Sequence, residues 1–341
     1  MATIYEVSEL AGVSLATVSR VMNDSARVSP KTRQKVMSAM EALEYRPNSV
    51  AQSLASGRSN CVGVLFSELH GPIFGAMVGA IEEELTKAGK TAIFAVGHSH
   101  RDKEKAGISS LAKRNCDALI LHVEAMTDQD LLEQKASGVP YVIINRRVKG
   151  LEESCITVDN ERGGYEATML LLEMGHRNIA YISGPLSWGD ARARLAGHKR
   201  ALAEYKEPFD ESLMVEGDYH ESGGGSAMQQ LFVQARVFSA VVCANDEMAA
   251  GAMDTIRTRG LSIPADISVV GFDNARWSRY LYPKLTTINY PVREIGSMAA
   301  RWVLKNIYAE EGAEIQCVFE PTRVNRESAG PVAQMSGYEA S

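Results

Sequence analysis

Three short apolar segments of this sequence are each followed by an acid or an amide. The residues concerned are Asn145, Asn245 and Asp273, and Arg146 stands directly after the first of them. Carboxylates accept hydrogen bonds, amides accept and donate them, and a guanidinium donates them, so together they suit a small molecule rich in hydroxyls. Each acid or amide could instead only cap the helix that follows its strand. Their recurrence at three strand ends favours one shared binding site.

The sequence carries no recognisable catalytic or metal-binding motif. It lacks Gly-x-x-x-x-Gly-Lys-Ser/Thr, His-Glu-x-x-His and Gly-x-Ser-x-Gly, and its glycine-rich segment 222–226 has neither the lysine nor the preceding strand of a phosphate loop. The 7 histidines form no cluster with metal-ligand spacing, and the 5 cysteines include no Cys-x-x-Cys pair. We therefore expect neither an enzyme nor a metal or cofactor site, and the cysteine pattern predicts a reducing, cytoplasmic setting.

Strand-like and helix-like segments alternate from residue 61 onwards, and this alternation would position the polar strand ends. It predicts parallel sheets with crossover helices on both faces. Two successive series predict two doubly wound sheets, whose ligands bind at the carboxyl ends of the strands, in the cleft between the halves. The predicted strands are 62–66, 91–96, 118–122, 141–144, 179–183, 240–243 and 267–270, and the predicted helices are 73–88, 103–114, 128–136, 163–174, 191–204, 224–234 and 247–259.

Length and charge bound the class of protein. A chain of 341 residues is long for one core, so we expect more than one domain. No segment reaches the roughly 18 apolar residues of a membrane helix, and the N-terminal residues lack the pattern of a secretory signal. The net charge of −6 is unevenly spread: residues 1–60 have seven lysines and arginines against five acids, and the remainder is acidic. A mildly basic head on an acidic body suits a protein that holds DNA at one end.

The basic head has the pattern of three short helices. Residues 4–11 predict a helix that stops at Gly12, and Ser14 can cap a second helix. Pro30 opens a third helix that we expect to reach Tyr45. Two helices joined by a glycine-containing turn form a helix-turn-helix, whose second helix can enter the DNA major groove.

Long ordered phrases in this head resemble a known family. They are AGVSLATVSRVMN at 11–23, VSPKTRQKVMSAMEALEYRPN at 28–48 and SVAQSLASG at 49–57. With them, residues 3–57 resemble the DNA-binding head of the LacI/GalR family of bacterial transcriptional repressors. Similar phrases continue at 175–179, 245–249, 267–273 and 285–288. The resemblance implies a periplasmic-binding-protein-like body in which the chain crosses between subdomains near 288–291, adds a helix at 294–307 to the first, and crosses again near 319–322.

The resemblance also implies how the head reads DNA. A guanidinium can bind guanine O6 and N7 with a fork of donors, so we expect Arg20 to contact a base, while Leu15 and Ala16 offer only apolar contacts. Residues 49–57 are either a plain linker or, as the family implies, a hinge helix that orders on DNA and places Leu54 in the minor groove. The expected phosphate-contacting or positioning residues, which could also be simple caps, are Tyr5, Ser14, Thr17, Ser19, Asn23 and Ser29, and the expected hinge residues are Asn48, Ala51 and Leu54.

In the body, the resemblance implies a pocket for a small effector. Arg194 matches the family's effector-binding arginine, and with Asp273 it can satisfy vicinal hydroxyls. Phe74 and Tyr219 match positions of rings or apolar walls. Asn145 followed by arginine is similar to the galactose- and glucoside-responsive branch, which favours a sugar over a purine. A nucleoside- or purine-type corepressor and a transcriptional activator stay open as alternatives. The expected effector-binding residues are Ser67, Ile73, Phe74, His122, Asn145, Arg146, Arg194, Tyr219, Asn245 and Asp273.

These expectations define a fold class and a domain plan. The fold class is a small all-α helix-turn-helix head and an α/β body of two doubly wound parallel-sheet subdomains. The expected partners are a double-stranded, pseudo-palindromic operator, a sugar-like effector and a second copy of the chain, with no membrane. The expected domains are 1–47, a hinge or linker at 48–58, an effector-binding and dimerisation domain at 59–330 (about 59–158 plus 291–319, and about 159–290 plus 320–330), and a disordered tail at 331–341.

Overall fold

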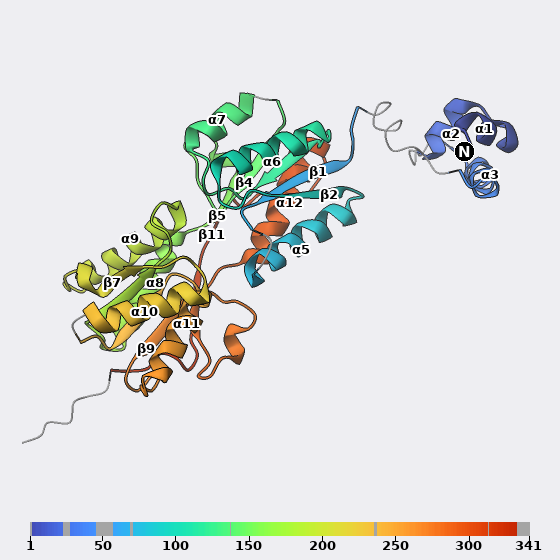
Figure 1. The fold of residues 1–341 in the computed structure, drawn as a ribbon. Helices are drawn as coiled ribbons and strands as arrows, with labels where there is room; N and C mark the ends of the chain where they lie inside the picture. The colour runs from blue at the N-terminus through green and yellow to red at the C-terminus, as the bar shows by residue number, and fades with distance from the viewer. Residues whose placement is uncertain are drawn as a thin grey trace, which may run out of the picture. The chain divides into compact units, whose positions relative to one another are not determined.

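The computed structural model of this chain has two units, a helical unit, Met1–Asn60, and an α/β unit, Cys61–Ser341 (Figure 1). The structure describes residues 2–22, 28–45, 57–68, 71–136, 138–234, 237–312 and 314–332. The predicted hinge residues Asn48, Ala51 and Leu54, the predicted phosphate contact Asn23, and residues 333–341 of the predicted tail lie outside the described residues.

The helical unit contains α1 (Ile4–Ala11), α2 (Leu15–Met22) and α3 (Pro30–Ala42). Gly12 ends α1 with a φ of 63°, a left-handed conformation that glycine adopts without a steric penalty. Val7, Val18 and Val36 are completely buried and join the three helices in one small core. The third helix ends at Ala42 and not at the predicted Tyr45, because Glu44 turns to a φ of 48°.

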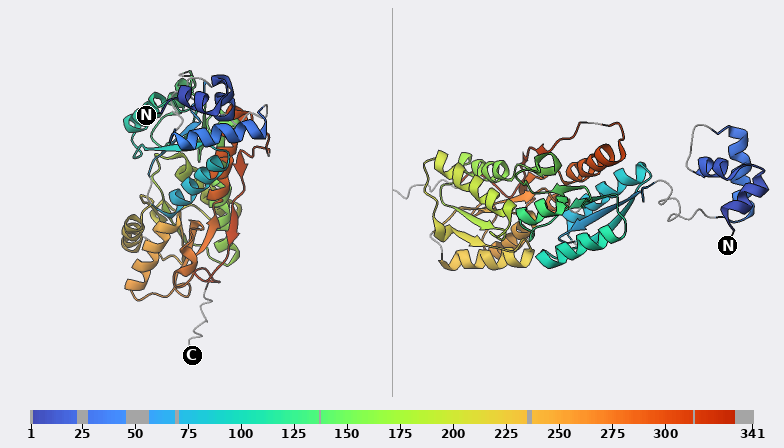
Figure 2. Two further views of the ribbon diagram at one scale, coloured as in Figure 1. Left: turned by 90° about the vertical axis from the view of Figure 1, so that its right-hand side faces the viewer. Right: turned by 90° about the horizontal axis from the view of Figure 1, so that it is seen from above.

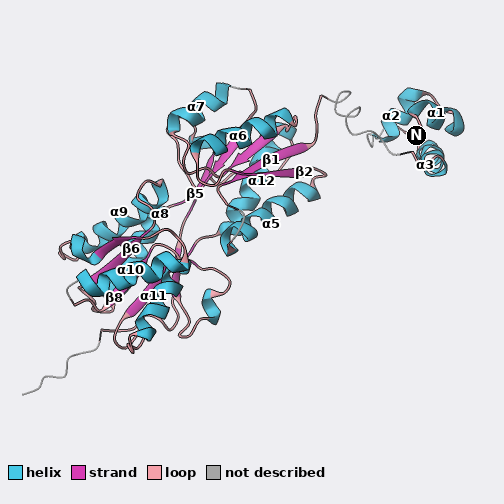
Figure 3. Cartoon of the chain, viewed as in Figure 1, coloured by secondary structure: helices cyan, strands magenta, loops and turns pink. Residues whose placement is uncertain are grey.

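The first sheet of the α/β unit is parallel throughout, in the order β11-β5-β4-β3-β1-β2. Successive side chains of a strand point to opposite faces, so Val64 of β1 packs in the core with α5 and α12, whereas Leu65 packs with α6 and α7. Figure 3 shows helices on both faces of this sheet. The bounds are β1 (Cys61–Phe66), α5 (Pro72–Lys87), β2 (Thr91–Val96), α6 (Arg101–Lys113), β3 (Ala118–Leu121), α7 (Asp128–Ala136), β4 (Tyr141–Ile144), β5 (Cys155–Val158), α12 (Val292–Tyr308) and β11 (Val318–Phe319).

The second sheet has the order β12-β10-β9-β8-β6-β7, and only the pairing of β12 with β10 is antiparallel. Helix α8 packs against α9, α10 packs against α11, and all four contact the sheet (Figure 2). The bounds are α8 (Asn160–Glu173), β6 (Ile179–Ser183), α9 (Gly189–Glu204), β7 (Met214–Glu216), α10 (Glu221–Gln234), β8 (Ala240–Cys243), α11 (Asp246–Thr258), β9 (Ser268–Asp273), β10 (Thr286–Asn289) and β12 (Thr322–Val324), with 3₁₀ turns at Glu152–Ser154, Glu211–Leu213 and Ser278–Tyr280.

The chain passes between the two sheets after β5, after β10 and between β11 and β12. The later two passages lie where the family resemblance implied them. Helix α12 returns to the first sheet, packs against α5, and holds it through an ion pair of 3.0 Å between Arg301 and Glu84. The sequence did not predict strands β5, β7, β10, β11 and β12, which are only two to four residues long. Strand β9 runs on to Asp273, so this residue ends the strand and does not follow it as we predicted.

Candidate functional site

A cavity of about 110 Å³ lies at the carboxyl ends of the strands of both sheets. Residues after β1, β3 and β4 line it from the first sheet, and residues after β6 and β8 and at the end of β9 line it from the second. Parallel strands present their carboxyl ends along one edge, which is why residues far apart in sequence meet here. Nine of the ten predicted effector-binding residues line this cavity: Ser67, Ile73, Phe74, His122, Asn145, Arg194, Tyr219, Asn245 and Asp273.

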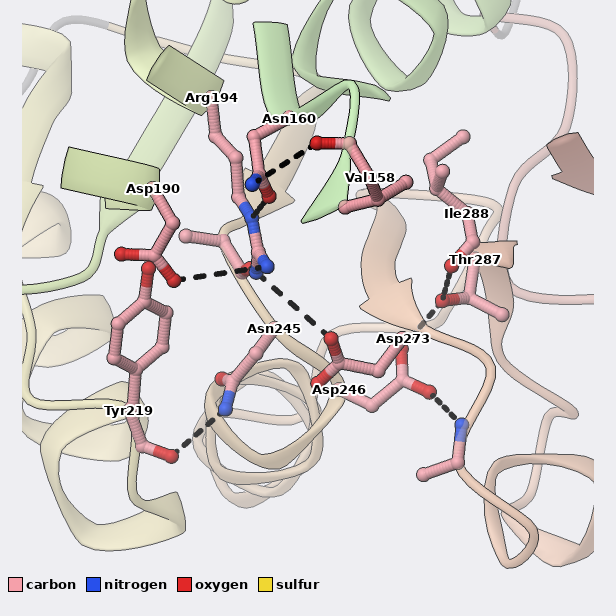
Figure 4. A network of polar contacts seen from close by, with 12 residues as sticks. Val158, Asn160, Asp190, Arg194, Tyr219, Asn245, Asp246, Asp273, Thr287 and Ile288 are labelled. Carbon is pink, nitrogen blue, oxygen red and sulfur yellow. Dashed lines mark hydrogen bonds and ion pairs between the residues drawn. The ribbon is translucent and has the colours of Figure 1, made fainter. Parts of the chain in front are cut away.

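Arg194 is the buried centre of the polar side of this cavity (Figure 4). Its Nε donates to Oδ1 of Asn160 at 2.8 Å, and its Nη1 donates to the carbonyl of Ala244 at 2.5 Å. The carboxylates of Asp190 and Asp273 each lie 3.8 Å from the guanidinium, on different sides of it. These bonds fix the plane of the guanidinium, so its position does not depend on a bound ligand.

The backbone of α9 reaches this position because two glycines let α8 and α9 touch. A Cβ on Gly164 would lie 2.0 Å from the carbonyl oxygen of Arg194, and a Cβ on Gly197 would lie 2.0 Å from that of Glu161. No real side chain tolerates such a distance, so both positions require glycine at this helix spacing. The close crossing therefore sets the depth at which Arg194 enters the cavity.

Acids outnumber cations around Arg194. Burial raises the pKa of the Asp273 carboxyl well above its usual value, and the nearby Arg194 charge offsets this only in part. Burial likewise raises the pKa of Glu124, and the negative charge of Asp190 raises it further. Burial lowers the pKa of His122 to about 4, so this imidazole is neutral at pH 7 and does not balance the acids. Because a raised pKa favours the protonated carboxyl, Asp273 and Glu124 can both donate and accept hydrogen bonds, and this suits a neutral ligand rich in hydroxyls.

Aromatic rings close the other sides of the cavity. Phe74 lies edge-on to His122, with their ring centroids 5.2 Å apart. The ring centroids of Trp188 and Tyr219 are 5.5 Å apart. Ser67 fixes the imidazole through a bond of 2.8 Å between its Oγ and the Nδ1 of His122. Flat apolar surfaces beside carboxylates and a guanidinium are the usual surroundings of a small polar ligand.

Three residues of the cavity adopt a left-handed backbone although they are not glycine. The φ angles are 62° at Asn145, 69° at Tyr219 and 116° at Asp273. Each such conformation costs about 1–3 kcal/mol, and such residues gather where a ligand is held. Asn145 Oδ1 and the hydroxyls of Tyr219 and Tyr290 are, in addition, buried polar atoms without a hydrogen-bond partner among the described residues. A ligand in the cavity would supply these partners.

Asn245 serves the structure of the site as well as its lining. Its Oδ1 accepts from the backbone N–H of Met248 at 2.9 Å and caps α11, and its Nδ2 donates to the carbonyl of Tyr219 at 2.8 Å. The helix-cap function that we weighed against binding is therefore present at this position. The second bond also holds Tyr219 in its left-handed conformation.

In the helical unit, the predicted base-reading residues lie on one surface of α2. Ala16 and Arg20, four residues apart, are exposed, and Leu15 is half-buried. Ser14 and Ser29 act as caps: each Oγ accepts from a backbone N–H at 3.2 Å, that of Thr17 and that of Thr32. The remaining predicted phosphate contacts with a described position are Tyr5, which is 69% exposed, and the half-buried Thr17 and Ser19.

Comparison with known proteins decides the family. Residues 3–48 match the profile of bacterial regulatory proteins of the lacI family, and residues 168–329 match that of a periplasmic binding protein-like domain. The HTH-type transcriptional regulator GalR of Escherichia coli is 39% identical over 340 residues, which cover 100% of this chain and 99% of the relative. GalR of Salmonella typhimurium is 40% identical over 96% of both chains. This chain belongs to the LacI family.

Solved structures of LacI-family proteins share the fold. The lac repressor dimer bound to operator and an anti-inducer superimposes with a TM-score of 0.85 at 32% identity, covering 96% of this chain and 99% of that one. The complex of the transcriptional regulator CelR with cellobiose gives a TM-score of 0.72 at 32% identity, covering 96% and 100%. This LacI-family chain is therefore a DNA-binding transcriptional regulator with an α/β effector domain.

Sequence reasoning missed several residues that this LacI-family chain places in the cavity. Glu124 lies two residues after His122 in the loop that follows β3, and Asp190 is at the first turn of α9. Tyr290 lies on the passage from β10 to α12, which no periodicity marks. An aspartate four residues before Arg194 was the one signal that could have been used, since i and i+4 share a helix face. The cavity residues that we did not predict are Glu68, Gly71, Met77, Glu124, Trp188, Asp190, Asp218, His220, Glu247 and Tyr290.

Arg146 is the one predicted effector-binding residue that does not line this cavity. Its guanidinium donates to the carbonyl of Met126 at 2.6 Å and to Oδ1 of Asp128 at 2.5 Å, so it turns away from Arg194 and lines a neighbouring, wider cavity. Asn145 precedes it with a φ of 62°, and this left-handed turn sends the two side chains in different directions.

Two further findings concern the described residues only. None of their helices combines the length and apolar character of a membrane-spanning segment. No group of three or more histidine, cysteine, aspartate or glutamate side chains among them is placed to hold a metal ion.

Proposed function

We propose that this protein is a transcriptional repressor whose affinity for its operator is controlled by a sugar bound between the two sheets of the α/β unit. The observation that carries this is the arrangement of Arg194 with Asp190 and Asp273 on one side of a ring-lined cavity. Two carboxylates accept hydrogen bonds from neighbouring hydroxyls, the guanidinium donates to a third oxygen, and a ring packs on the apolar face of a pyranose. Solved relatives support the ligand class, since one holds cellobiose and one lac repressor structure holds ONPG.

The chemistry of the cavity argues against anionic effectors. Arg194 is the one lysine or arginine among the described residues that line this cavity, and two of its donors already bind Asn160 and Ala244, so a phosphate would find little positive charge to pair with. We therefore favour a neutral sugar over a nucleotide or a sugar phosphate. The alternative is a nucleoside- or purine-type corepressor, and no contact in this cavity favours it.

On the DNA side, we propose that Arg20 reads a base while Leu15 and Ala16 exclude or touch thymine methyls. Tyr5, Ser14, Thr17, Ser19, Asn23 and Ser29 would position the helix on phosphates, and Asn48, Ala51 and Leu54 would act in the minor groove. A homodimer on a pseudo-palindromic operator follows the example of the lac repressor dimer. We further propose a cytoplasmic location and no catalytic activity.

The effector controls DNA binding only through a difference in its affinity for two arrangements of the α/β unit. A sugar that prefers the arrangement incompatible with operator binding is an inducer, and we favour this sign. The residues that would sense the change span both sheets, because the cavity is lined from each of them.

A thermal-shift screen of the full chain tests the ligand class. The panel contains monosaccharides, disaccharides, nucleosides, purine bases and sugar phosphates. A ligand that binds only the folded state at a hundred times its Kd adds about 2.7 kcal/mol to the free energy of unfolding, so a sugar should raise Tm measurably. The Asp273→Asn variant should lose this shift. A shift with nucleosides or purines and with no sugar would overturn the proposed effector and leave the family assignment intact.

A further inference from the structure

A second, wider cavity of about 800 Å³ adjoins the first one in the cleft of the α/β unit. Glu124, Asn145 and Asp190 line both cavities, so these three side chains form their common boundary. Glu124 and Asn145 belong to the first sheet's loops, whereas Asp190 opens α9 of the second subdomain. The boundary is therefore built from both halves of the cleft.

The boundary is weakly closed. Nδ2 of Asn145 reaches Oδ2 of Asp190 at 3.4 Å, which is at the long end of hydrogen-bond distances. Oδ1 of the same amide is buried, and no partner is found for it among the described residues. A long hydrogen bond costs little free energy to break. A ligand that crosses the boundary would accept a hydrogen bond from Nδ2 of Asn145 with one of its oxygens and donate one to Oδ1 with a hydroxyl.

The first cavity is small for a ligand-binding site. Ligand sites in proteins usually enclose about 300–1,000 Å³. The space beside Arg194 is about 110 Å³ and falls below that range, whereas the adjoining space of about 800 Å³ lies inside it. A ligand seated beside Arg194 can extend past Asn145 and Asp190 into this wider space.

The lining of the wider cavity is polar and comes from both subdomains. Thr127, Arg146 and Thr157 contribute from the first subdomain and the passage out of it, and Asn160 and Arg192 contribute from the second. Both of these guanidiniums are already engaged: Arg146 binds Met126 and Asp128, and Arg192 donates to the carbonyls of Leu186 and Ser187 at 2.8 and 2.7 Å. An apolar group would leave such a surface without partners, whereas a hydroxyl-rich group would pair with it.

We propose that the wider cavity is a second sugar subsite and that the effector is a disaccharide, with one ring beside Arg194 and the second unit beyond Asn145 and Asp190. This rests on the proposed function, in which the ligand beside Arg194 is a sugar. The carboxyl groups of Glu124 and Asp190 stand at the boundary, where they can exchange hydrogen bonds with the hydroxyls of a sugar that spans both cavities. The glycosidic linkage lies at the boundary and replaces the contact between Asn145 and Asp190.

The test separates the two subsites by filling one of them. Ala193 lies on α9, is half-buried, and lines the wider cavity but not the first. Ala193→Phe should narrow the second subsite and leave the space beside Arg194 unchanged. Ala196→Phe is the matched control, since Ala196 is an exposed residue of the same helix that lines neither cavity. Ser187→Phe, at an exposed position on another segment of the lining, gives an independent plug.

Isothermal titration of the full chain with lactose, melibiose, cellobiose and gentiobiose, beside galactose, glucose and glucose 6-phosphate, measures the effect. At least one disaccharide should bind tenfold or more tightly than either monosaccharide. Ala193→Phe and Ser187→Phe should weaken that disaccharide at least tenfold while changing monosaccharide affinity less than twofold, and Ala196→Phe should change neither. Thermal unfolding without ligand identifies a variant that has not folded, and the other plug then decides.

Three outcomes would overturn the second subsite. Equal binding of a monosaccharide and its disaccharides, unaffected by either plug, leaves the sugar function standing and removes the subsite. Tighter binding of a hexose 6-phosphate, lost in both plugs, makes the occupant an anion. Absence of binding by every sugar rejects the proposed function itself, and the disaccharide proposal with it.

Discussion

Two hydrogen-bonded acceptors and two carboxyl groups surround the guanidinium of Arg194. Asn160 and Ala244 take its hydrogen bonds, and Asp190 and Asp273 lie at 3.8 Å without direct contact. At such distances the acids keep accepting capacity for a ligand, while the two fixed bonds orient the guanidinium. The planar shape of this group, and not only its charge, is therefore needed at this position.

Arg194→Lys should weaken sugar binding roughly tenfold or more, because an ammonium keeps the charge but loses the fork of donors. The bonds to Asn160 and Ala244 cannot both form, so Tm should also fall. Arg200→Lys on the same helix is the control, since Arg200 is exposed and pairs with Glu161. Isothermal titration of both variants measures this, and equal affinities in both would show that the ligand binds elsewhere.

The buried carboxyl of Asp246 should make the free energy of unfolding depend on pH. It is fully buried, accepts from Thr287 Oγ1 at 2.5 Å and from the N–H of Ala275 at 2.8 Å, and burial raises its pKa to about 7 (Figure 4). Because the folded state binds this proton more tightly than the unfolded state, its contribution to stability is complete below about pH 4 and is lost as pH rises through about 7. Its slope cannot exceed about 1.4 kcal/mol per pH unit.

Asp246→Asn should remove this contribution to the pH dependence. Urea unfolding followed by tryptophan fluorescence between pH 5 and 8 should show that the stability difference between the native chain and the variant changes with pH. Asp254→Asn is the matched control on the same helix, since the Asp254 side chain is 76% exposed. Parallel pH profiles for the native chain and Asp246→Asn would show that Asp246 does not titrate in this range.

At the scale of elements, the crossing of α8 and α9 determines where the cavity's central arginine stands. The space between the two helices has no room for a side chain at Gly164 or Gly197. Sequence periodicity predicted both helices, but a glycine inside a helix is unfavourable by itself and gains its value only from the neighbouring helix.

Gly164→Ala should destabilise the α/β unit by about 1–3 kcal/mol or more, since its Cβ would meet the backbone of Arg194 and force the helices apart. Sugar affinity should fall as well, because Arg194 moves with α9. In Gly189→Ala the nearest atom is the end of the Arg192 side chain at 4.0 Å, so stability should stay within about 0.5 kcal/mol of the native chain. Thermal unfolding compares the two variants, titration compares Gly164→Ala with the native chain, and a stable Gly164→Ala with native affinity would contradict the argument.

At the scale of the whole molecule, the proposed control of DNA binding requires reciprocity. If the sugar lowers operator affinity by some factor, the operator must lower sugar affinity by the same factor, and such factors are typically about 5- to 150-fold. Operator binding of the full chain with and without ligand, and sugar titration with and without operator, measure both sides. Arg194→Lys should keep operator binding and lose the response. A sugar that binds tightly but leaves operator affinity unchanged would reject the repressor mechanism while keeping the pocket.

The sequence by itself determined the local elements of this protein. The three helices of the head, their glycine stop and serine caps, and nearly all helices and longer strands of the body follow from short-range periodicity and capping. The strand-end rule also brought Asn145, Asn245 and Asp273 to one cavity, because parallel strands share a carboxyl edge. Their part in binding an effector stays a prediction.

Only the tertiary structure decided the features that depend on contacts across the chain. The two-residue strand β11 has no pattern of its own and exists because β5 provides its partners. Tyr290 enters the cavity because the chain passes there between sheets, and Arg146 leaves it because Asn145 turns left-handed. The contact between Asn145 and Asp190 joins residues 45 positions apart from different subdomains. Periodicity records which face of an element is buried, whereas the partner against which it packs is set by the packing of all elements together.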